Sequence, residues 1–286
     1  ILDLIVGNGG DNPFCDHADW ADARLVTQSG REIYLDTITQ ESSMDLSPML
    51  RHRFPFSFIY GDTVSDDLLP DWQEDKTETV LDGHRRQQVT NWTDPESGLK
   101  VTCEMTWFND FPAIDWVLYF ENTGTVDTPI LADIQTMDVT FPTRMSIEQP
   151  YYLHKTNGAP STPEDFEYSG AVISSAHDER LSAGGGRSSN KDFPFFKVDT
   201  GDGSLIAAIG WSGQWAAELS CPDNYNLQLK AGIEKTHFLL HPGERVRMPR
   251  ILLMHWAGES WEANAQFRQL IYKHYVARRS GKQPLP

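Results

Sequence analysis

The sequence predicts an all-β fold of mainly antiparallel strands, stacked as sheets and completed by one C-terminal α-helix. Three observations lead to this prediction: short segments alternate apolar and polar residues, turn residues separate these segments at short intervals, and strands do not alternate with helices. A chain of 286 residues is long for an average domain but suits one large β-sandwich. These observations argue against a nucleotide-binding α/β fold.

The clearest element is a hairpin. Apolar residues occupy every second position from Leu99 to Trp107 and again from Ile114 to Phe120, as expected for two strands that each bury one face. Residues Asn109 to Pro112 lie between them and have the composition of a turn. Cys103 falls within the first strand, so we expect it to be a small buried residue.

Further strands follow on both sides of a polar, glycine-rich stretch from Thr156 to Asp192. We expect them at Ile130–Ile134, Val139–Phe141, Tyr151–His154, Phe195–Val198, Leu205–Trp211, Trp215–Leu219, Asn226–Leu229, Thr236–Leu240 and Val246–Trp256. Before the last of these, Pro242 and Gly243 are predicted to form the centre of a type II turn. Proline presets the first dihedral of such a turn, and glycine accepts the positive φ of the second position.

One helix is predicted after Trp256. Ser260 is expected to cap its amino end, and Glu262 lies in the first turn, where negative charge is favoured. The apolar spacing of the helix is carried by Ala263, Phe267, Leu270, Ile271 and His274. We therefore expect one sandwich domain over residues 1–279 and a linker over residues 280–286, which have linker composition.

Charge and hydropathy limit the classes of partner. The chain has 24 basic and 41 acidic residues and a net charge of −17, so it repels phosphate backbones and anionic lipids. No apolar run approaches the roughly 18 to 20 residues that cross a bilayer. We expect neither nucleic acid nor membrane as partner. A neutral sugar meets no such repulsion, and the nine tryptophans could stack on sugar rings or fill the core.

The sequence contains no strong catalytic or metal-binding motif. Cys15, Cys103 and Cys221 are odd in number and far apart, which argues against a disulfide framework. The mixed cluster between Asp11 and Asp19 is the one weak candidate for a metal, and we expect no metal and no cofactor. Glycoside hydrolysis needs two facing carboxyl groups, and the 41 acidic residues single out no pair, so no catalytic residue is assigned.

Several segments nevertheless occur in a characteristic order. They are Pro55–Gly61, Leu68–Trp72, Thr93–Gly98, Asp110–Trp116, Gly185–Ser189, Ala208–Trp215 and Leu240–Glu244. Together they resemble the amino-terminal domain of glycoside hydrolase family 36 and its relatives in clan D, the α-galactosidases. The resemblance covers most of the chain from about Phe54 onward.

The resemblance implies a large β-supersandwich that precedes a (β/α)₈ barrel. In such enzymes the two catalytic aspartates lie on the barrel, so we expect this chain alone to be inactive. The resemblance implies a galactoside-type carbohydrate and the catalytic barrel as partners, and a homo-oligomer as a further possibility. The chain begins at Ile1 rather than methionine, which suggests that an upstream segment was removed, and a secreted or periplasmic protein is slightly favoured over a cytoplasmic one.

Two loops are candidates for contact with substrate. Asp71 would accept hydrogen bonds from sugar hydroxyls, and Trp72 would either stack on a sugar ring or anchor its own loop. In the glycine-rich segment, Arg187, Ser188 and Ser189 would bond sugar hydroxyls, unless the segment is simply a surface loop. The expected function is a supporting domain of an α-galactosidase. The alternatives are a stand-alone galactoside-binding module and an oligomerisation domain.

Overall fold

The computed structural model describes residues 24–26, 32–34, 54–142, 151–201, 203–223 and 226–278. The chain divides into two units at residue 41. In the first unit, β1 (Arg24–Val26) and β2 (Glu32–Tyr34) pair as an antiparallel ribbon. The second unit holds all the other elements. The predicted linker at 280–286 and the mixed cluster between Asp11 and Asp19 lie outside the described residues.

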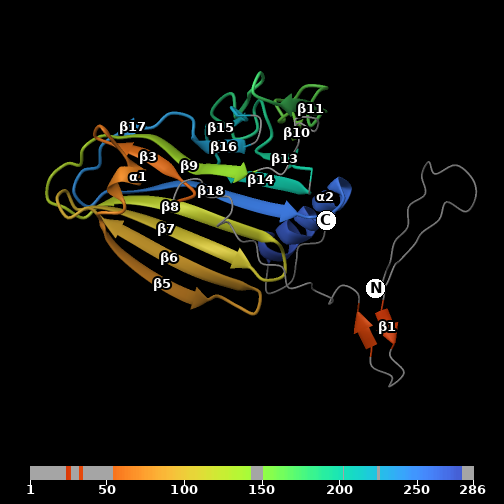
Figure 1. Ribbon diagram of the computed structural model, residues 1–286, viewed down its shortest axis with the longest axis horizontal. Helices are drawn as coiled ribbons and strands as arrows, with labels where there is room; N and C mark the ends of the chain where they lie inside the picture. The colour runs from red at the N-terminus through yellow and green to blue at the C-terminus, as the bar shows by residue number, and fades with distance from the viewer. Residues whose placement is uncertain are drawn as a thin grey trace, which may run out of the picture. The chain divides into compact units, whose positions relative to one another are not determined.

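The second unit is built around two antiparallel sheets that face each other (Figure 1). The larger sheet has nine strands, in the order β11 (Tyr168–Ile173), β10 (Tyr151–Thr156), β13 (Phe195–Asp199), β14 (Ser204–Gly210), β18 (Arg245–Trp256), β8 (Ala113–Asn122), β7 (Leu99–Phe108), β6 (Arg85–Thr93) and β5 (Gln73–Val80). The predicted all-β sandwich with one C-terminal helix is confirmed.

The smaller sheet has seven strands. Its order is β12 (Glu179–Ser182), β15 (Trp215–Ser220), β16 (Asn226–Ile233), β9 (Leu131–Pro142), β3 (Ser57–Tyr60) and β4 (Thr63–Val64), with β17 (His237–Phe238) also paired to β9. The short helix α1 (Ser65–Leu68) follows β4, and α2 (Ser260–His274) follows β18. Within the described residues, no helix is both long enough and apolar enough to span a bilayer.

The alternating pattern located most strands correctly. The predicted hairpin is formed by β7 and β8, in a register that pairs Val101 with Phe120 and Met105 with Trp116. Residues predicted as two strands around 130–141 form the single strand β9. The type II turn is also present, because Gly243 has φ +82° and the Glu244 amide donates to the His241 carbonyl at 3.0 Å.

Other expectations were wrong. The stretch from Thr156 to Asp192 contains two strands, β11 and β12. The acidic segment between Asp62 and Asp75, for which no strand or helix was predicted, contains β4, α1 and the start of β5. Many residues of these elements are exposed: both residues of β4 and every residue of β5 are. Edge strands gain their backbone hydrogen bonds without a buried face, so hydropathy does not reveal them.

The main core fills the space between the sheets. Trp116 and Trp215 are its largest fully buried side chains, and each such ring contributes roughly 2 to 3 kcal/mol through burial. The Trp116 indole nitrogen donates to the Thr136 carbonyl at 2.7 Å, which ties the nine-stranded sheet to β9. Cys103 is buried in this core as predicted, and burial raises the pKa of its thiol.

A second, smaller core lies on the outer face of the nine-stranded sheet, where α2 packs (Figure 1). Ala263 and Leu270 of the helix are buried there against side chains of β7, β14 and β18. The predicted cap was wrong by one residue: Glu259 is the N-cap, and it forms a reciprocal capping box with Glu262. Ser260 is the first helical residue, and its hydroxyl is used in a different network.

Candidate functional site

The first candidate loop lies between α1 and β5. The Asp71 carboxylate is exposed, and its amide donates to the Leu68 carbonyl at 3.0 Å, which continues the turn of α1. Trp72 is only 8% exposed. Its ring centroid lies 5.9 Å from that of Tyr60 and 6.5 Å from that of Phe58. Trp72 therefore anchors its own loop, while its stacking on a sugar stays a prediction.

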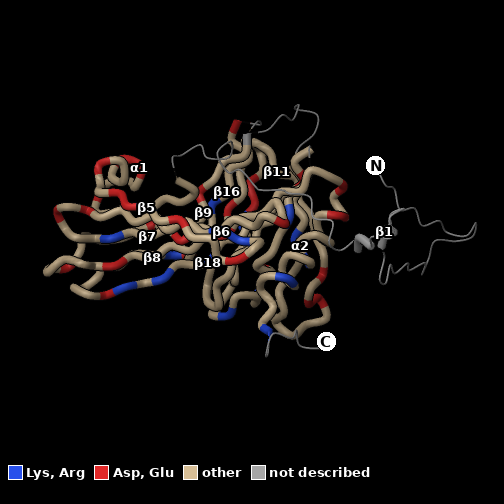
Figure 2. The backbone as a smooth tube through the Cα atoms, turned by 90° about the horizontal axis from the view of Figure 1, so that it is seen from below, with Lys and Arg blue, Asp and Glu red and all other residues tan. Residues whose placement is uncertain are grey.

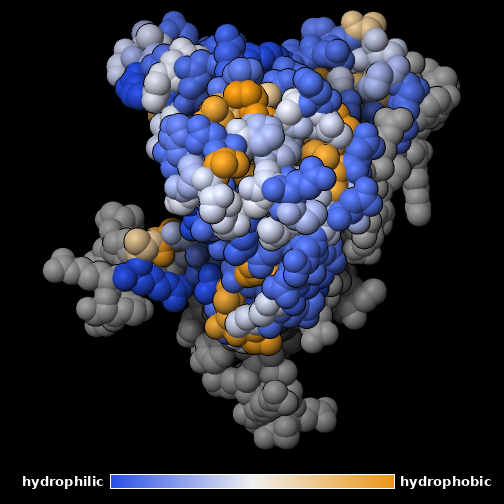
Figure 3. Space-filling view, turned by 90° about the vertical axis from the view of Figure 1, so that its left-hand side faces the viewer, coloured by the Kyte–Doolittle hydropathy of each residue, from blue (hydrophilic) through white to orange (hydrophobic). Residues whose placement is uncertain are grey.

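Around this loop the surface is acidic and broken into small patches. Figure 2 shows acidic residues along α1, where Asp66 and Asp67 occupy the first turn. The end of the unit that carries α1 faces the viewer in Figure 3, and hydrophobic residues there form small separate patches among hydrophilic ones. An exposed carboxylate such as Asp71 in this setting can accept hydrogen bonds from hydroxyl groups.

The second candidate loop follows β12. It is closed by the Lys191 amide, which donates to the Ala183 carbonyl at 2.9 Å. The indole nitrogen of Trp215 donates to the Ser188 carbonyl at 2.6 Å, and the Ala159 amide donates to the Ser189 carbonyl at 2.7 Å. The backbone of this glycine-rich loop is thus held by neighbouring segments, as in an ordered turn.

Arg187 is the exposed charged group at the tip of that loop. Its guanidinium donates to the Asn190 side-chain oxygen at 2.7 Å, which orients the guanidinium and leaves it other N–H groups. The hydrogen bonds of Ser188 and Ser189 described above are accepted by their backbone carbonyls, so these bonds do not involve the side-chain hydroxyls. Sugar binding by Arg187, Ser188 and Ser189 stays a prediction.

The structure does not bring the two candidate loops together. One loop follows β12 and the other follows β4 and α1, and these strands form opposite edges of the seven-stranded sheet. Strands lie about 4.8 Å apart, and five such spacings separate β12 from β4, so these two edge strands lie roughly 20 to 25 Å apart. A single sugar ring cannot contact both loops of one chain.

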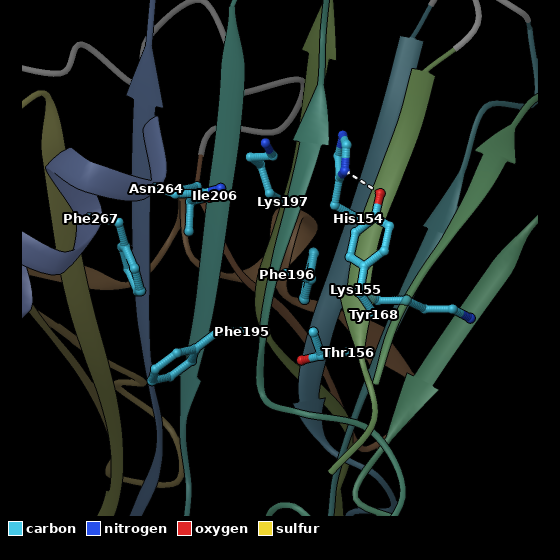
Figure 4. A pocket seen from close by; sticks show the side chains of 10 residues that line it. All are labelled: His154, Lys155, Thr156, Tyr168, Phe195, Phe196, Lys197, Ile206, Asn264 and Phe267. Atoms are coloured by element: carbon cyan, nitrogen blue, oxygen red, sulfur yellow. Dashed lines mark hydrogen bonds between the residues drawn. The ribbon is translucent and has the colours of Figure 1, made fainter. Parts of the chain in front are cut away.

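A pocket that the sequence did not indicate lies between α2 and the outer face of the nine-stranded sheet (Figure 4). Its volume is about 210 Å³. Strands β10, β11, β13 and β14 contribute to its wall together with α2. The lining residues are His154, Lys155, Thr156, Tyr168, Phe195, Phe196, Lys197, Ile206, Asn264 and Phe267.

A hydrogen-bonded network borders this pocket. The two ring nitrogens of His154 contact the Tyr168 hydroxyl and the Asp199 carboxylate, each at 2.7 Å. The Asp199 carboxylate also accepts hydrogen bonds from the hydroxyls of Ser204 at 2.8 Å and Ser260 at 2.9 Å. Ser260 begins α2, so this carboxylate joins the helix to the sheet.

The network has a balanced charge. The side chain of Lys197 is 9% exposed, its ammonium donates to the Ser260 carbonyl at 3.0 Å, and it lies 3.9 Å from the Asp199 carboxylate. Burial lowers the pKa of Lys197, while the attraction of Asp199 opposes that change. Burial disfavours ionised Asp199, but hydrogen bonds from His154, Ser204 and Ser260 outweigh burial and hold its pKa below the ordinary value.

A second pocket, of about 320 Å³, lies beside the end of α2. It contains one carboxylate, that of Asp115, whose side chain is 4% exposed. Arg250 donates to Asp115 at 2.7 Å, and the Tyr275 hydroxyl donates to its other oxygen. Burial and the nearby Asp115 raise the pKa of Tyr275, so its hydroxyl stays protonated as a donor. Both oxygens of the Asp115 carboxylate are therefore engaged in structural hydrogen bonds.

Neither pocket presents the carboxylate pair that glycoside hydrolysis requires: the first is lined by none, and the second by Asp115 alone. Among the described residues, no group of three or more histidine, cysteine, aspartate or glutamate side chains is arranged to hold a metal ion. The side chains of the two pockets can contact a bound molecule, but neither pocket contains an acid and a nucleophile for glycosidic cleavage.

No family model and no curated protein matches the sequence. Solved structures do match. The α-galactosidase AgaB of Geobacillus stearothermophilus is 16% identical, the match covers 91% of this chain and 38% of that chain, and the TM-score is 0.58. AgaA of the same organism, in complex with raffinose, is 17% identical over 93% of this chain and 38% of its own, with a TM-score of 0.58.

An α-galactosidase of Lactobacillus brevis is 12% identical over 96% of this chain and 39% of its own, with a TM-score of 0.55. The resemblance drawn from the sequence motifs is thereby confirmed at the level of fold. This chain has the fold of one part of a family 36 α-galactosidase. It spans less than two fifths of the length of these enzymes. The matched region therefore covers nearly all of this chain but only a part of each enzyme.

Sequence reasoning missed the pocket below α2. A signal was present, because His154 and Lys197 occupy outward positions of predicted strands whose alternate residues are apolar. Only the pairing of β10 with β13, which sets His154 opposite Lys197, brings the two side chains together. Asp199 and Ser260 were not recognised as partners because they lie 61 residues apart in sequence.

Proposed function

We propose that this chain is a non-catalytic sandwich domain of an α-galactosidase-like glycoside hydrolase, acting in carbohydrate metabolism as the support of a catalytic (β/α)₈ barrel. One observation carries the proposal. Family 36 α-galactosidases match more than nine tenths of this chain but only 38% of their own length. The part left over in those enzymes is large enough for a separate catalytic domain.

The chemistry of the described residues supports this division of labour. A hydrolytic site needs an acid and a nucleophile or base across the glycosidic bond. The two pockets do not supply such a pair, and the one carboxylate that lines them, Asp115, is held by Arg250 and Tyr275. The proposed role of this chain is therefore to support the reaction rather than to perform it.

The two candidate loops give the supporting role its proposed detail. Asp71 and Arg187 are exposed at the tips of ordered loops, where they can reach a partner surface. We place galactoside hydroxyls opposite these groups. Since the loops lie at opposite edges of one sheet, two loops of one chain would serve different sugar residues or different catalytic pockets.

Turnover of an aryl α-galactoside tests the proposal. The purified chain should release no phenol above the buffer rate, at any substrate concentration. Turnover that survives repurification and disappears when one carboxylate of this chain is changed to the amide would refute the proposal. The coding sequence after Pro286 provides an independent test, because it should encode a (β/α)₈ barrel with paired aspartates.

The two alternative functions predict different measurements. A stand-alone galactoside-binding module should bind melibiose or raffinose in calorimetry through residues of a candidate loop, so Arg187→Ala or Asp71→Ala should abolish the binding at the loop that it changes. An oligomerisation domain should form a stable dimer in light scattering without any effect of sugar on the melting temperature. A monomer whose response to these sugars is unchanged by Arg187→Ala and by Asp71→Ala supports the proposed role.

A further inference from the structure

The pocket below α2 has the composition of a binding site for a small molecule. Pockets of this kind combine an apolar lining with a few convergent polar groups. Phe195 and Phe267 form one side, with their ring centroids 5.5 Å apart, and Ile206 lies beside them. Figure 4 shows Tyr168 across the pocket from Phe267, and Lys197 between the two sides.

The charges at this pocket argue for a neutral ligand. The three basic side chains in its lining each have a carboxylate neighbour: Lys197 lies 3.9 Å and His154 2.7 Å from Asp199, and Lys155 lies 2.8 Å from Glu179. No cation there is left without a carboxylate among the described residues. A phosphate or carboxylate ligand would have to displace these contacts inside a protein whose net charge is −17.

Uncharged hydrogen-bonding groups remain available. Thr156 from β10 and Asn264 from α2 line the pocket, and within the described part of the chain neither side chain is engaged in a hydrogen bond. Together a hydroxyl and a primary amide provide three donors and two acceptor oxygens. Groups of this kind bond the hydroxyls of a sugar without requiring charge.

Exposed aromatic rings border the pocket on the side of the sheet edge. Tyr168 is 58% exposed although its hydroxyl contacts His154 at 2.7 Å, so the polar end is fixed while the ring face meets solvent. The neighbouring Tyr152 is 38% exposed and packs edge-on against His154, with ring centroids 4.9 Å apart. An oriented, solvent-exposed ring of this kind suits the apolar face of a pyranose.

We propose that this pocket, formed by β10, β11, β13, β14 and α2, binds one ring of a neutral saccharide, with Tyr168 as the stacking platform and Thr156 and Asn264 as the polar contacts. The hydrogen bonds of Asp199 and Lys197 to Ser260 hold α2 against the sheet and so fix the width of the pocket. The proposal does not depend on the galactosidase assignment and uses none of the loop residues Asp71, Trp72 and 187–189.

Ligand-observed saturation-transfer NMR on the full chain tests this site, with methyl α-galactoside and methyl β-glucoside as neutral probes and galacturonate and inorganic phosphate as charged ones. We expect millimolar binding of at least one neutral glycoside and at least tenfold weaker binding of the anions. Tyr168→Ala and Asn264→Ala should each weaken binding about tenfold or more, and Tyr168→Phe should retain most of it because the ring remains.

Tyr272→Ala is the matched control. Tyr272 is an exposed aromatic residue of α2, the helix that carries Asn264, and it does not line the pocket. This variant should leave binding unchanged, and the melting curve of each variant should show a cooperatively folded protein. Absence of saturation transfer from both neutral glycosides, preferential binding of phosphate or galacturonate, or binding lost in Arg187→Ala but kept in Asn264→Ala would each overturn the proposal. None of these outcomes changes the expected lack of hydrolytic turnover, so the two proposals fail separately.

Discussion

Replacing Asp199 by asparagine should destabilise the protein by a measurable and pH-dependent amount. The carboxylate accepts hydrogen bonds from two serine hydroxyls, contacts His154 and faces the buried ammonium of Lys197. Asparagine retains the shape and one acceptor oxygen but removes the charge. A hydrogen bond to a charged group contributes about 1.5 to 3 kcal/mol, and because Asp199 is 32% exposed we expect a net loss of about 2 kcal/mol.

The sign of the pH dependence follows from the lowered pKa of Asp199. A carboxyl group whose folded pKa lies below its unfolded value of about 3.9 stabilises the fold above that value, and this stability is lost as the pH falls through the folded pKa. The stabilisation that the Asp199 carboxylate supplies over Asp199→Asn should therefore be present above about pH 4 and narrow below it.

Urea unfolding followed by tryptophan fluorescence measures this difference. For a unit of this size, 2 kcal/mol corresponds to roughly 4 to 8 °C in the melting temperature. Asp71→Asn is the matched control, since that carboxylate is exposed, and it should change stability by less than about 0.5 kcal/mol. A loss below 0.5 kcal/mol for Asp199→Asn, or an equal loss at all pH values, would show that the network does not hold α2 to the sheet.

Three further substitutions test the packing assignments by the same unfolding measurement. Trp72→Ala should cost about 3 to 5 kcal/mol because a buried ring is removed, and a loss under 1 kcal/mol would mean that Trp72 does not anchor its loop. Tyr275→Phe should cost about 1.5 to 3 kcal/mol through its bond to Asp115, and an unchanged stability would mean that this hydrogen bond does not stabilise the fold. Gly243→Ala should cost about 1 to 2 kcal/mol because φ is +82° although no atom lies within 4 Å of the new methyl group. Gly83→Ala, equally open but without positive φ, should cost less, and equal effects would contradict the turn assignment.

Much of the fold could be predicted from the sequence because alternation and turn chemistry are local properties. Strands with an apolar face toward the main core, such as β7 and β8, are visible as apolar residues at every second position. The Pro242–Gly243 turn was equally visible, since proline presets φ at the first central position and glycine accepts the positive φ of the second. Strands such as β5 and β11 were not, because their stability comes from hydrogen bonds to a neighbour rather than from a hydrophobic face.

The candidate site was less accessible to sequence reasoning. The motifs selected Asp71 and Arg187 as candidates, but their place at opposite edges of one sheet became clear only from the strand order. The same holds for Trp72, whose burial against Tyr60 and role as an anchor of its loop became clear only from the structure. Burial depends on which segments meet across the sandwich, and no local pattern encodes that.

The sequence by itself determined that this protein is a β-sandwich with a terminal helix, because residue spacing along each strand fixes which face is apolar. It also indicated the resemblance to family 36 α-galactosidases through the order of its motifs. Only the tertiary structure decided where α2 packs and which polar residues it brings together. Register and sheet order set His154, Lys197, Asp199 and Ser260 side by side, and these long-range contacts result from the packing of the whole chain.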